Sequence, residues 1–326
     1  MKKLNNQVFC AIMVVMITAS CSSNKKNAAP LSLYKTDEGK GTAYRSYDKA
    51  MELWDVEYRE EFVETDYGQS HVIVSGEEQG PALMLLPGLF ADATMWYPNV
   101  RDLSQHYKVY TLDMLNYGGK SKPNGKAIAS VDDYKTWFTQ ILNHYQIPEA
   151  SVAGLSYGSW LTLALAREIP DTLSSIILLD PSETFMPMNS SMAWKGFKYF
   201  LFFPNRKKYK KFFDWIGGGY TDPKMEVWFE HMLDVIEFGS VKMFDVPQHK
   251  IYEPDELKMI KMPVLVMAGG KPILYDNPEE FKTNAIEAIP HAEVIIVADA
   301  GHGLNMEKPE TVNKAIIQFL QKDTMD

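Results

Sequence analysis

One serine stands between two glycines in the stretch Gly154-Leu155-Ser156-Tyr157-Gly158. The apolar residues before it are typical of a short strand, and the run SWLTLALAREI after it is typical of a helix. In that setting, the G-x-S-x-G spacing favours a sharp turn that holds a serine hydroxyl above the end of a sheet. Such a pentapeptide also occurs by chance, so the prediction depends on the flanking strand and helix. Ser156 is therefore the candidate nucleophile.

A histidine stands between two glycines near the end of the chain, in the run ADAGHGLNMEKPE. This run follows the last apolar strand pattern, and the glycines allow the loop to fold back toward Ser156. An isolated histidine is more often a surface or core residue. The order of nucleophile and then histidine, with the histidine after the last strand, favours His302 as the general base.

Alternating strand and helix patterns must position these residues. Two hairpin-like strands and a buried strand precede residue 87, and strands and helices then alternate to residue 320. This alternation predicts a mostly parallel sheet with helices on both faces, and ligands bind such sheets at the carboxyl ends of the strands. The aromatic-rich segment 182–256 interrupts the alternation and is predicted to be a helical insertion.

Together these segments resemble the α/β-hydrolase superfamily, in the branch with a helical cap after strand six. The resemblance implies an eight-stranded, mostly parallel sheet, a core formed by residues 43–181 and 257–326, and a cap formed by residues 182–256. It also implies serine esterase chemistry on a small-molecule ester, through an acyl-enzyme intermediate and without a metal or cofactor. The same fold supports other acyl or C–C bond hydrolases, and it can also serve as an inactive, hydrolase-like binding lipoprotein.

The stretch LLPGLFADATMW resembles the turn that builds half of the oxyanion hole in this family. Pro87 replaces the usual histidine, and Gly88 is retained. The resemblance implies that the backbone amides of Leu89 and Tyr157 face the developing oxyanion.

The acid of the triad is the point at which the sequence departs from the family. It usually stands in the turn after the strand PVLVMAG, one residue before a Pro-Ile-like pair, and Lys271 occupies that place. A lysine cannot accept the imidazole N–H. Asp180, at the end of the preceding strand, is preferred as the acid over Asp276, with Glu183 third. An Asp-Pro pair is also a turn signal, which leaves a purely structural role open for Asp180.

The N-terminus predicts export. Lys2 and Lys3 precede an apolar stretch at 8–19 that is too short to span a bilayer, so residues 1–20 fit a signal peptide better than an uncleaved anchor or a buried helix. Ser20-Cys21 resembles the lipobox of bacterial lipoproteins, although Thr18 stands where leucine is usual. Lipidation of Cys21 would anchor the protein to the extracytoplasmic membrane surface, with 21–42 as a polar tether. Cleavage by an ordinary signal peptidase would instead give a secreted or periplasmic protein.

The bulk composition narrows the function further. The chain has 326 residues and a net charge of −9, which argues against a general nucleic-acid binder. Cys10 and Cys21 are the only cysteines, so the predicted domain has no disulfide, thiol nucleophile or zinc–cysteine site. The basic run 206–211 is expected to form a solvated helix face, with contact to anionic lipid as the alternative. The sequence specifies no oligomeric state.

Overall fold

The computed structural model describes residues 31–200, 205–217, 222–240 and 246–322. The predicted signal peptide and Cys21 lie outside these ranges. Among the described residues, no helix is both long enough and apolar enough to cross a bilayer.

The centre of the molecule is one twisted sheet with the strand order β1-β2-β4-β3-β6-β7-β8-β9. The pairings β1–β2 and β2–β4 are antiparallel, and every pairing from β4 to β9 is parallel. The predicted eight strands form this path, and the two-residue strand β5, paired with β2, adds a ninth. The strands are β1 (Tyr58–Thr65), β2 (Gly68–Gly76), β3 (Ala82–Leu86), β4 (Lys108–Leu112), β5 (Lys122–Pro123), β6 (Ala150–Leu155), β7 (Leu173–Leu179), β8 (Val264–Gly269) and β9 (Glu293–Val297).

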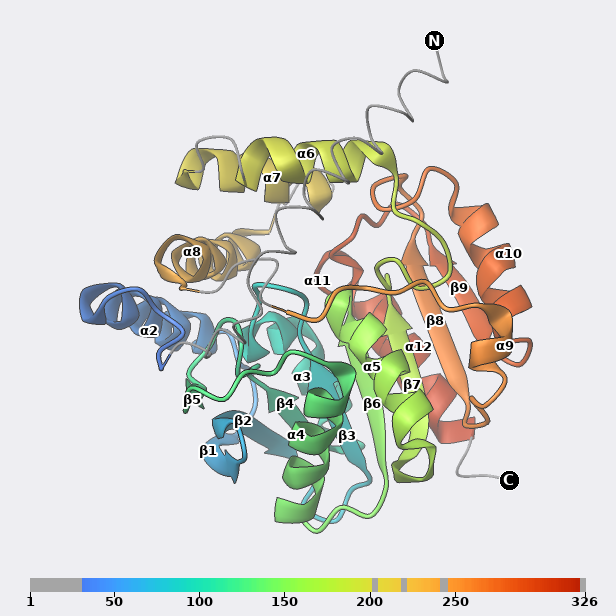
Figure 1. Ribbon diagram of the computed structural model, residues 1–326, viewed down its shortest axis with the longest axis horizontal. Coiled ribbons are helices and arrows are strands. Elements are labelled where there is room, and N and C mark those ends of the chain that lie inside the picture. The colour runs from blue at the N-terminus through green and yellow to red at the C-terminus, as the bar shows by residue number, and fades with distance from the viewer. Residues whose placement is uncertain (1–30, 201–204, 218–221, 241–245, 323–326) are drawn as a thin grey trace, which may run out of the picture.

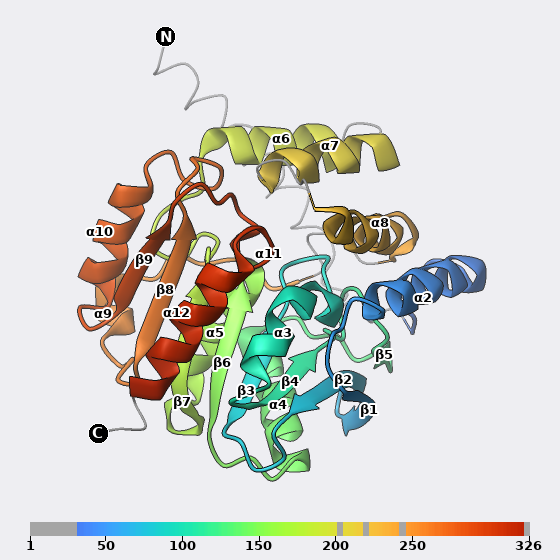
Figure 2. The same ribbon diagram turned by 180° about the vertical axis from the view of Figure 1, so that it is seen from behind.

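Helices cover both faces of the sheet (Figures 1 and 2). One buried cluster joins a face of the sheet to α4 (Val131–His144), α5 (Tyr157–Glu168) and α10 (Pro278–Ala288). A second cluster joins the other face to α3 (Tyr97–Leu103) and α12 (Pro309–Lys322). The short elements η1 (Ala93–Trp96), η2 (Pro170–Thr172), α9 (Pro254–Leu257) and α11 (Leu304–Glu307) complete the core.

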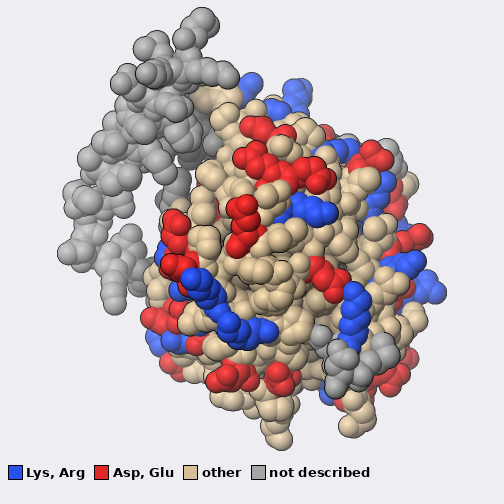
Figure 3. Space-filling view, turned by 90° about the vertical axis from the view of Figure 1, so that its right-hand side faces the viewer, with Lys and Arg blue, Asp and Glu red and all other residues tan. Residues whose placement is uncertain are grey.

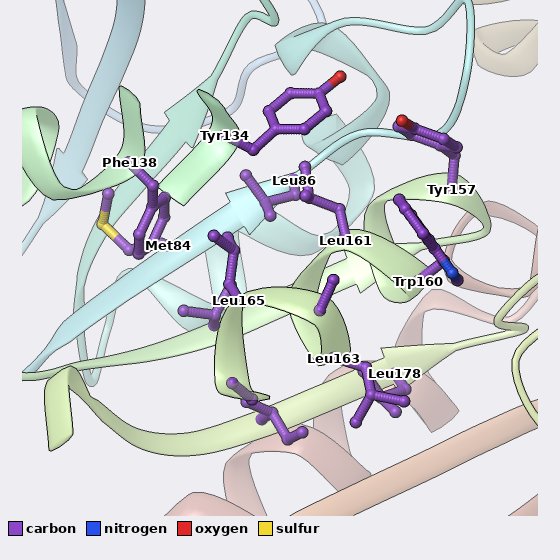
Figure 4. Close-up of a cluster of buried hydrophobic side chains, with 14 of the residues drawn as sticks. Met84, Leu86, Tyr134, Phe138, Tyr157, Trp160, Leu161, Leu163, Leu165 and Leu178 are labelled. Carbon is purple, nitrogen blue, oxygen red and sulfur yellow. The ribbon is translucent and has the colours of Figure 1, made fainter. Parts of the chain in front are cut away.

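Helix α5, which begins directly after the predicted nucleophile, is deeply buried. Every residue from Tyr157 to Ala166 is buried. Figure 4 shows Leu161 and Leu165 of this helix packed with Met84 and Leu86 of β3. Burial of a leucine side chain contributes roughly 1.5–3 kcal/mol, so α5 is a rigid support for the turn that precedes it.

The predicted cap consists of α6 (Ser190–Phe200), α7 (Arg206–Ile216) and α8 (Pro223–Phe238), which lie above the carboxyl ends of the strands (Figure 1). Part of the basic run stabilises this cap. Arg206 forms ion pairs with three acidic residues of α8, and Lys210 pairs with Glu226 of the same helix. Acidic and basic side chains both occur across the face shown in Figure 3, as is usual for a water-exposed surface.

The predicted end of the tether at residue 42 is wrong. Leu33 and Tyr34 are buried, and Tyr34 pairs with Gly239 at the end of α8. Helix α2 (Asp37–Met51) then begins after the N-cap Thr36, whose side chain accepts a hydrogen bond from the Gly39 amide. Few apolar residues occur in 31–42, so its composition resembled a linker, yet this segment packs against the cap.

A buried contact between a histidine and a carboxylate joins the cap to the core. His231 of α8 and Asp92, in the loop after β3, lie 2.7 Å apart, and each is 1% exposed. Ser46 of α2 bonds the other ring nitrogen of His231 at 2.9 Å. Burial alone would raise the pKa of Asp92, but the facing His231 and hydrogen bonds from Thr94 lower it on balance.

We expect Asp92→Asn to lower the free energy of unfolding by about 3 kcal/mol at pH 7, because it leaves buried His231 without its carboxylate. Since folding lowers the pKa of Asp92, its contribution is complete above the unfolded value of about 4 and is lost as pH falls through the lower folded-state pKa. Urea unfolding followed by circular dichroism at several pH values measures this difference.

Asp55→Asn is the matched control, because Asp55 and its partner Arg101 are both exposed. This variant should change stability by less than about 1 kcal/mol. Equal effects of the two substitutions would contradict the structural role of the Asp92–His231 pair.

Candidate active site

The turn between β6 and α5 holds Ser156 in a conformation that few serines adopt. Its backbone has φ 56° and ψ −114°, a region that costs of order 1–3 kcal/mol for a non-glycine residue. The amide of Ser156 donates to Leu179 O at 2.9 Å. The Ser159 hydroxyl donates to Gly154 O at 2.6 Å and to Leu179 O at 2.8 Å, which ties the turn to β7.

The glycines of the pentapeptide are required by close backbone approach. A Cβ on Gly154 would lie 2.2 Å from the Gly158 carbonyl carbon, and a Cβ on Gly158 would lie 2.6 Å from Leu86 O and Pro87 O. The turn is therefore pressed against the end of β3. Larger side chains at either position would move Ser156.

His302 lies between Ser156 and Asp180. Its Nε2 is 2.9 Å from Ser156 Oγ, and its Nδ1 is 2.5 Å from Asp180 Oδ2. A carboxylate only accepts hydrogen bonds, so Nδ1 carries the proton and Nε2 presents its lone pair to the serine hydroxyl. The chain Ser156–His302–Asp180 has the hydrogen-bond order of a nucleophile, a general base and an orienting acid.

Asp180 is held at the end of β7 by the backbone of β8. Its amide donates to Met267 O at 2.7 Å, and its Oδ1 accepts from the Gly269 amide at 3.1 Å. Asp180 has φ 42°, a left-handed conformation that aspartate tolerates better than most residues. The strand whose turn usually supplies the acid thus provides a hydrogen-bond donor to an acid on the neighbouring strand.

The two other candidate acids lie elsewhere. Asp276 is exposed, and no hydrogen bond joins it to His302. Glu183 lies 3.8 Å from His249, and burial raises its pKa. Of the three carboxylates, the structure brings only Asp180 to the histidine.

Lys271 does not interrupt the hydrogen-bonded chain. Its amide donates to Ala300 O at 3.0 Å, and its ammonium lies 3.9 Å from Glu307 Oε2. The alternative of an inactive binding protein depended on this lysine replacing the triad acid. Asp180 bonds His302 instead, so the lysine no longer supports that alternative.

The loop after β3 lies beside the serine. A Cβ on Gly88 would lie 3.7 Å from Ser156 Cβ. Neither Leu89 nor Tyr157 donates its backbone N–H to another residue in the described part of the chain. Tyr157 is also the first residue of α5, where amides have no partner within the helix. Both amides are therefore available as donors for an anionic oxygen.

The segment that returns from the cap to the core is fixed against α5. The Tyr157 hydroxyl donates to Pro247 O at 2.9 Å, and the Trp160 indole donates to Lys250 O at 3.1 Å. His249 bonds Ser182 Oγ at 2.6 Å, and burial lowers the pKa of His249 to about 4. His249 is consequently neutral at pH 7 and adds no charge beside the serine turn.

The sequence reasoning missed three groups that support His302: the Gly269 amide, the Ile216 carbonyl and the Glu307 carboxylate. Two of them are backbone groups from distant segments and have no local sequence signal. The contact of Glu307 could have been predicted, because Glu307 follows His302 by only five residues in a short helical pattern. Among the described residues, no group of three or more His, Cys, Asp or Glu side chains is placed to hold a metal.

A family model described as "Alpha/beta hydrolase family" matches residues 83–315. The chain is 28% identical over 291 residues to an uncharacterized carboxylesterase, nap, of Bacillus subtilis (strain 168), with 86% of this chain and 93% of the relative covered. It is also 28% identical over 283 residues to carboxylesterase YbfK of that strain, with 85% and 93% covered. The crystal structure of naproxen esterase from Bacillus subtilis has a TM-score of 0.79 and 26% identity, with 88% of this chain and 99% of that chain covered.

We expect Asp180→Asn to slow covalent labelling of Ser156 by a fluorophosphonate by about 10⁴-fold, because the amide no longer fixes the imidazole tautomer. Asp276→Asn, the matched control, should label at the rate of the unsubstituted protein. Mass spectrometry of the labelled serine peptide over time measures both rates. Slow labelling of the Asp276 variant with normal labelling of the Asp180 variant would reverse the assignment.

Proposed function

Since the chain belongs to the alpha/beta hydrolase family, we propose that it is a serine esterase that cleaves carboxylic esters through an acyl-enzyme intermediate. The observation that supports this proposal most strongly is the hydrogen-bonded chain Ser156–His302–Asp180. The similarity to two carboxylesterases over more than four-fifths of the chain favours an ester as the substrate.

The first half of the proposed reaction transfers the acyl group to the enzyme. His302 Nε2 takes the hydroxyl proton while Ser156 Oγ attacks the ester carbonyl carbon. The negative charge that develops on the carbonyl oxygen is stabilised by the amides of Leu89 and Tyr157, and loss of one such donor costs about 3 kcal/mol in related chemistry. The tetrahedral intermediate then expels the alcohol, which takes its proton from His302.

The second half restores the enzyme. A water molecule gives a proton to His302 Nε2 and attacks the acyl carbon. Collapse of the second tetrahedral intermediate releases the carboxylic acid and returns the proton to Ser156 Oγ. Asp180 keeps its hydrogen bond to Nδ1 and stabilises the imidazolium in both halves.

We expect the purified domain to hydrolyse p-nitrophenyl esters, and Ser156→Ala to lower kcat by about 10⁶-fold, the loss measured when a triad serine is removed from a protease. A panel of esters of increasing acyl length, followed by nitrophenolate absorbance, gives kcat/KM for each substrate. A folded protein that hydrolyses none of these esters and is not labelled by a fluorophosphonate would contradict the proposed function.

We also propose that the protein is exported and lipid-anchored at Cys21 on the extracytoplasmic side of a bacterial membrane. Leu33, the first buried residue of the described chain, lies twelve positions after Cys21. This length reaches at most about 40 Å when extended. The anchor would therefore keep the esterase close to the membrane surface.

We expect the full chain to sediment with membranes in a bacterial host that processes lipoproteins, and Cys21→Ser to become soluble, because a lipid chain contributes about 0.8 kcal/mol per buried CH₂ group. Cys10→Ser is the matched control and should stay with the membranes. Immunoblots of membrane and soluble fractions measure the distribution. A Cys21→Ser protein that still sediments with membranes would argue against lipidation.

A further inference from the structure

Three consecutive backbone amides fix the position of His302. The amides of Gly301 and Gly303 donate to the two carboxylate oxygens of Glu307, at 2.8 Å and 3.2 Å. The amide of His302 itself donates to Ile216 O, at the end of α7, at 3.0 Å. One side chain therefore holds the backbone on both sides of the general base.

Glu307 is placed for this contact by the short helix α11, of which it is the last residue. Its side chain is only 9% exposed. Burial raises the pKa of the Glu307 carboxyl, while the two glycine amides and the charges of Lys271 and His302 act in the opposite direction. The buried carboxylate thus depends on its partners to stay ionised.

Lys271 supplies the positive charge from the turn after β8. Its ammonium lies 3.9 Å from Glu307 Oε2, and its backbone is bonded to the histidine loop through Ala300 O. The place that usually holds the triad acid therefore holds the counter-charge of Glu307.

We propose that Glu307 is a positioning residue that holds the His302 loop in its reactive geometry, and that Lys271 supports it by opposing its charge. This inference rests on the proposed esterase function and deepens it. Flanking glycines leave the histidine backbone with more conformational freedom than other residues would. His302 must nevertheless keep Nε2 2.9 Å from Ser156 while Nδ1 bonds Asp180.

Two substitutions at Glu307 test the charge and the length of its side chain separately. Glu307→Gln keeps the length but removes the charge, and its NH₂ group cannot accept one of the two glycine amides. Glu307→Asp keeps the charge but is one methylene too short to reach both amides. Displacement of a reacting group by about 1 Å can cost 10²-fold in rate, so we expect both variants to lose about 10²-fold in kcat, with KM changed by less than about threefold.

The pH profile of kcat/KM distinguishes an electrostatic role from a merely structural one. In the part of the chain that the structure describes, the titratable groups that face this pair are Asp180 beside His302 and Lys271 beside Glu307, in addition to His302 and Glu307 themselves. Removal of a negative charge in Glu307→Gln should move the acid limb to lower pH. Removal of a positive charge in Lys271→Met should move the acid limb to higher pH, with a loss of no more than about fivefold at neutral pH.

The experiment measures hydrolysis of one p-nitrophenyl ester by the unsubstituted protein, Glu307→Gln, Glu307→Asp and Lys271→Met between pH 5 and 9. Glu310→Gln is the control, because Glu310 is an exposed acid in the next helix, and its profile should not change. Opposite shifts of the Gln and Met variants support the proposal. Unchanged kcat in Glu307→Gln, or an unmoved acid limb in Lys271→Met, overturns it.

Lys271→Met keeps the proposal testable if Glu307 variants fail to fold, because the lysine side chain is 36% exposed and its loss leaves no cavity in the core. The proposed function is tested separately by the unsubstituted protein. If that protein hydrolyses no ester, the esterase proposal fails. If it is active and Glu307→Gln matches it in kcat and pH profile, only the positioning role fails.

Discussion

The short hydrogen bond from His302 Nδ1 to Asp180 Oδ2, 2.5 Å long, is the contact on which the geometry of the site depends. It joins the end of β7 to the loop after β9, so the end of β8, which lies between them, must leave room. Gly269 provides that room, since a Cβ there would come within 2.4 Å of Gly301 O. Gly269 therefore has two roles: it allows β8 to approach the histidine loop closely, and its amide donates a hydrogen bond to Asp180.

The cap supports the site as well as covering it. Ile216 at the end of α7 accepts from the His302 amide, and His231 of α8 bonds Asp92 in the segment that follows Leu89. Because α2 bonds the same histidine through Ser46, the N-terminal segment is linked to the oxyanion side of the site. A buried carboxylate that loses its hydrogen-bond partner is costly. These contacts favour a cap that stays docked through α8.

The sequence was most informative where function depends on local patterns. Ser156 and His302 were predicted because their flanking glycines and strand ends lie within a few residues of them. Asp180 could be ranked first because parallel strands end at one edge of the sheet. Contacts between distant segments had no such signal. Asp92 and His231 are 139 residues apart, and the hydrogen bond to the Ile216 carbonyl is a backbone contact that does not depend on residue type. The tether was predicted too long because residues 31–42 contain few apolar side chains, yet Leu33 and Tyr34 within it are buried.

The move of the acid from β8 to β7 changes the charge balance around the histidine. Asp180 bonds the imidazole directly, and Glu307 holds the adjacent backbone, so two carboxylates flank one base. Two anions would favour the imidazolium, whereas a general base works best when it is neutral near the working pH. Lys271 adds an opposing charge 3.9 Å from Glu307. Lys271, the residue that departs from the family pattern, thus offsets the charge of Glu307. An aspartate in that position after β8 could not do so, because it would add a further negative charge.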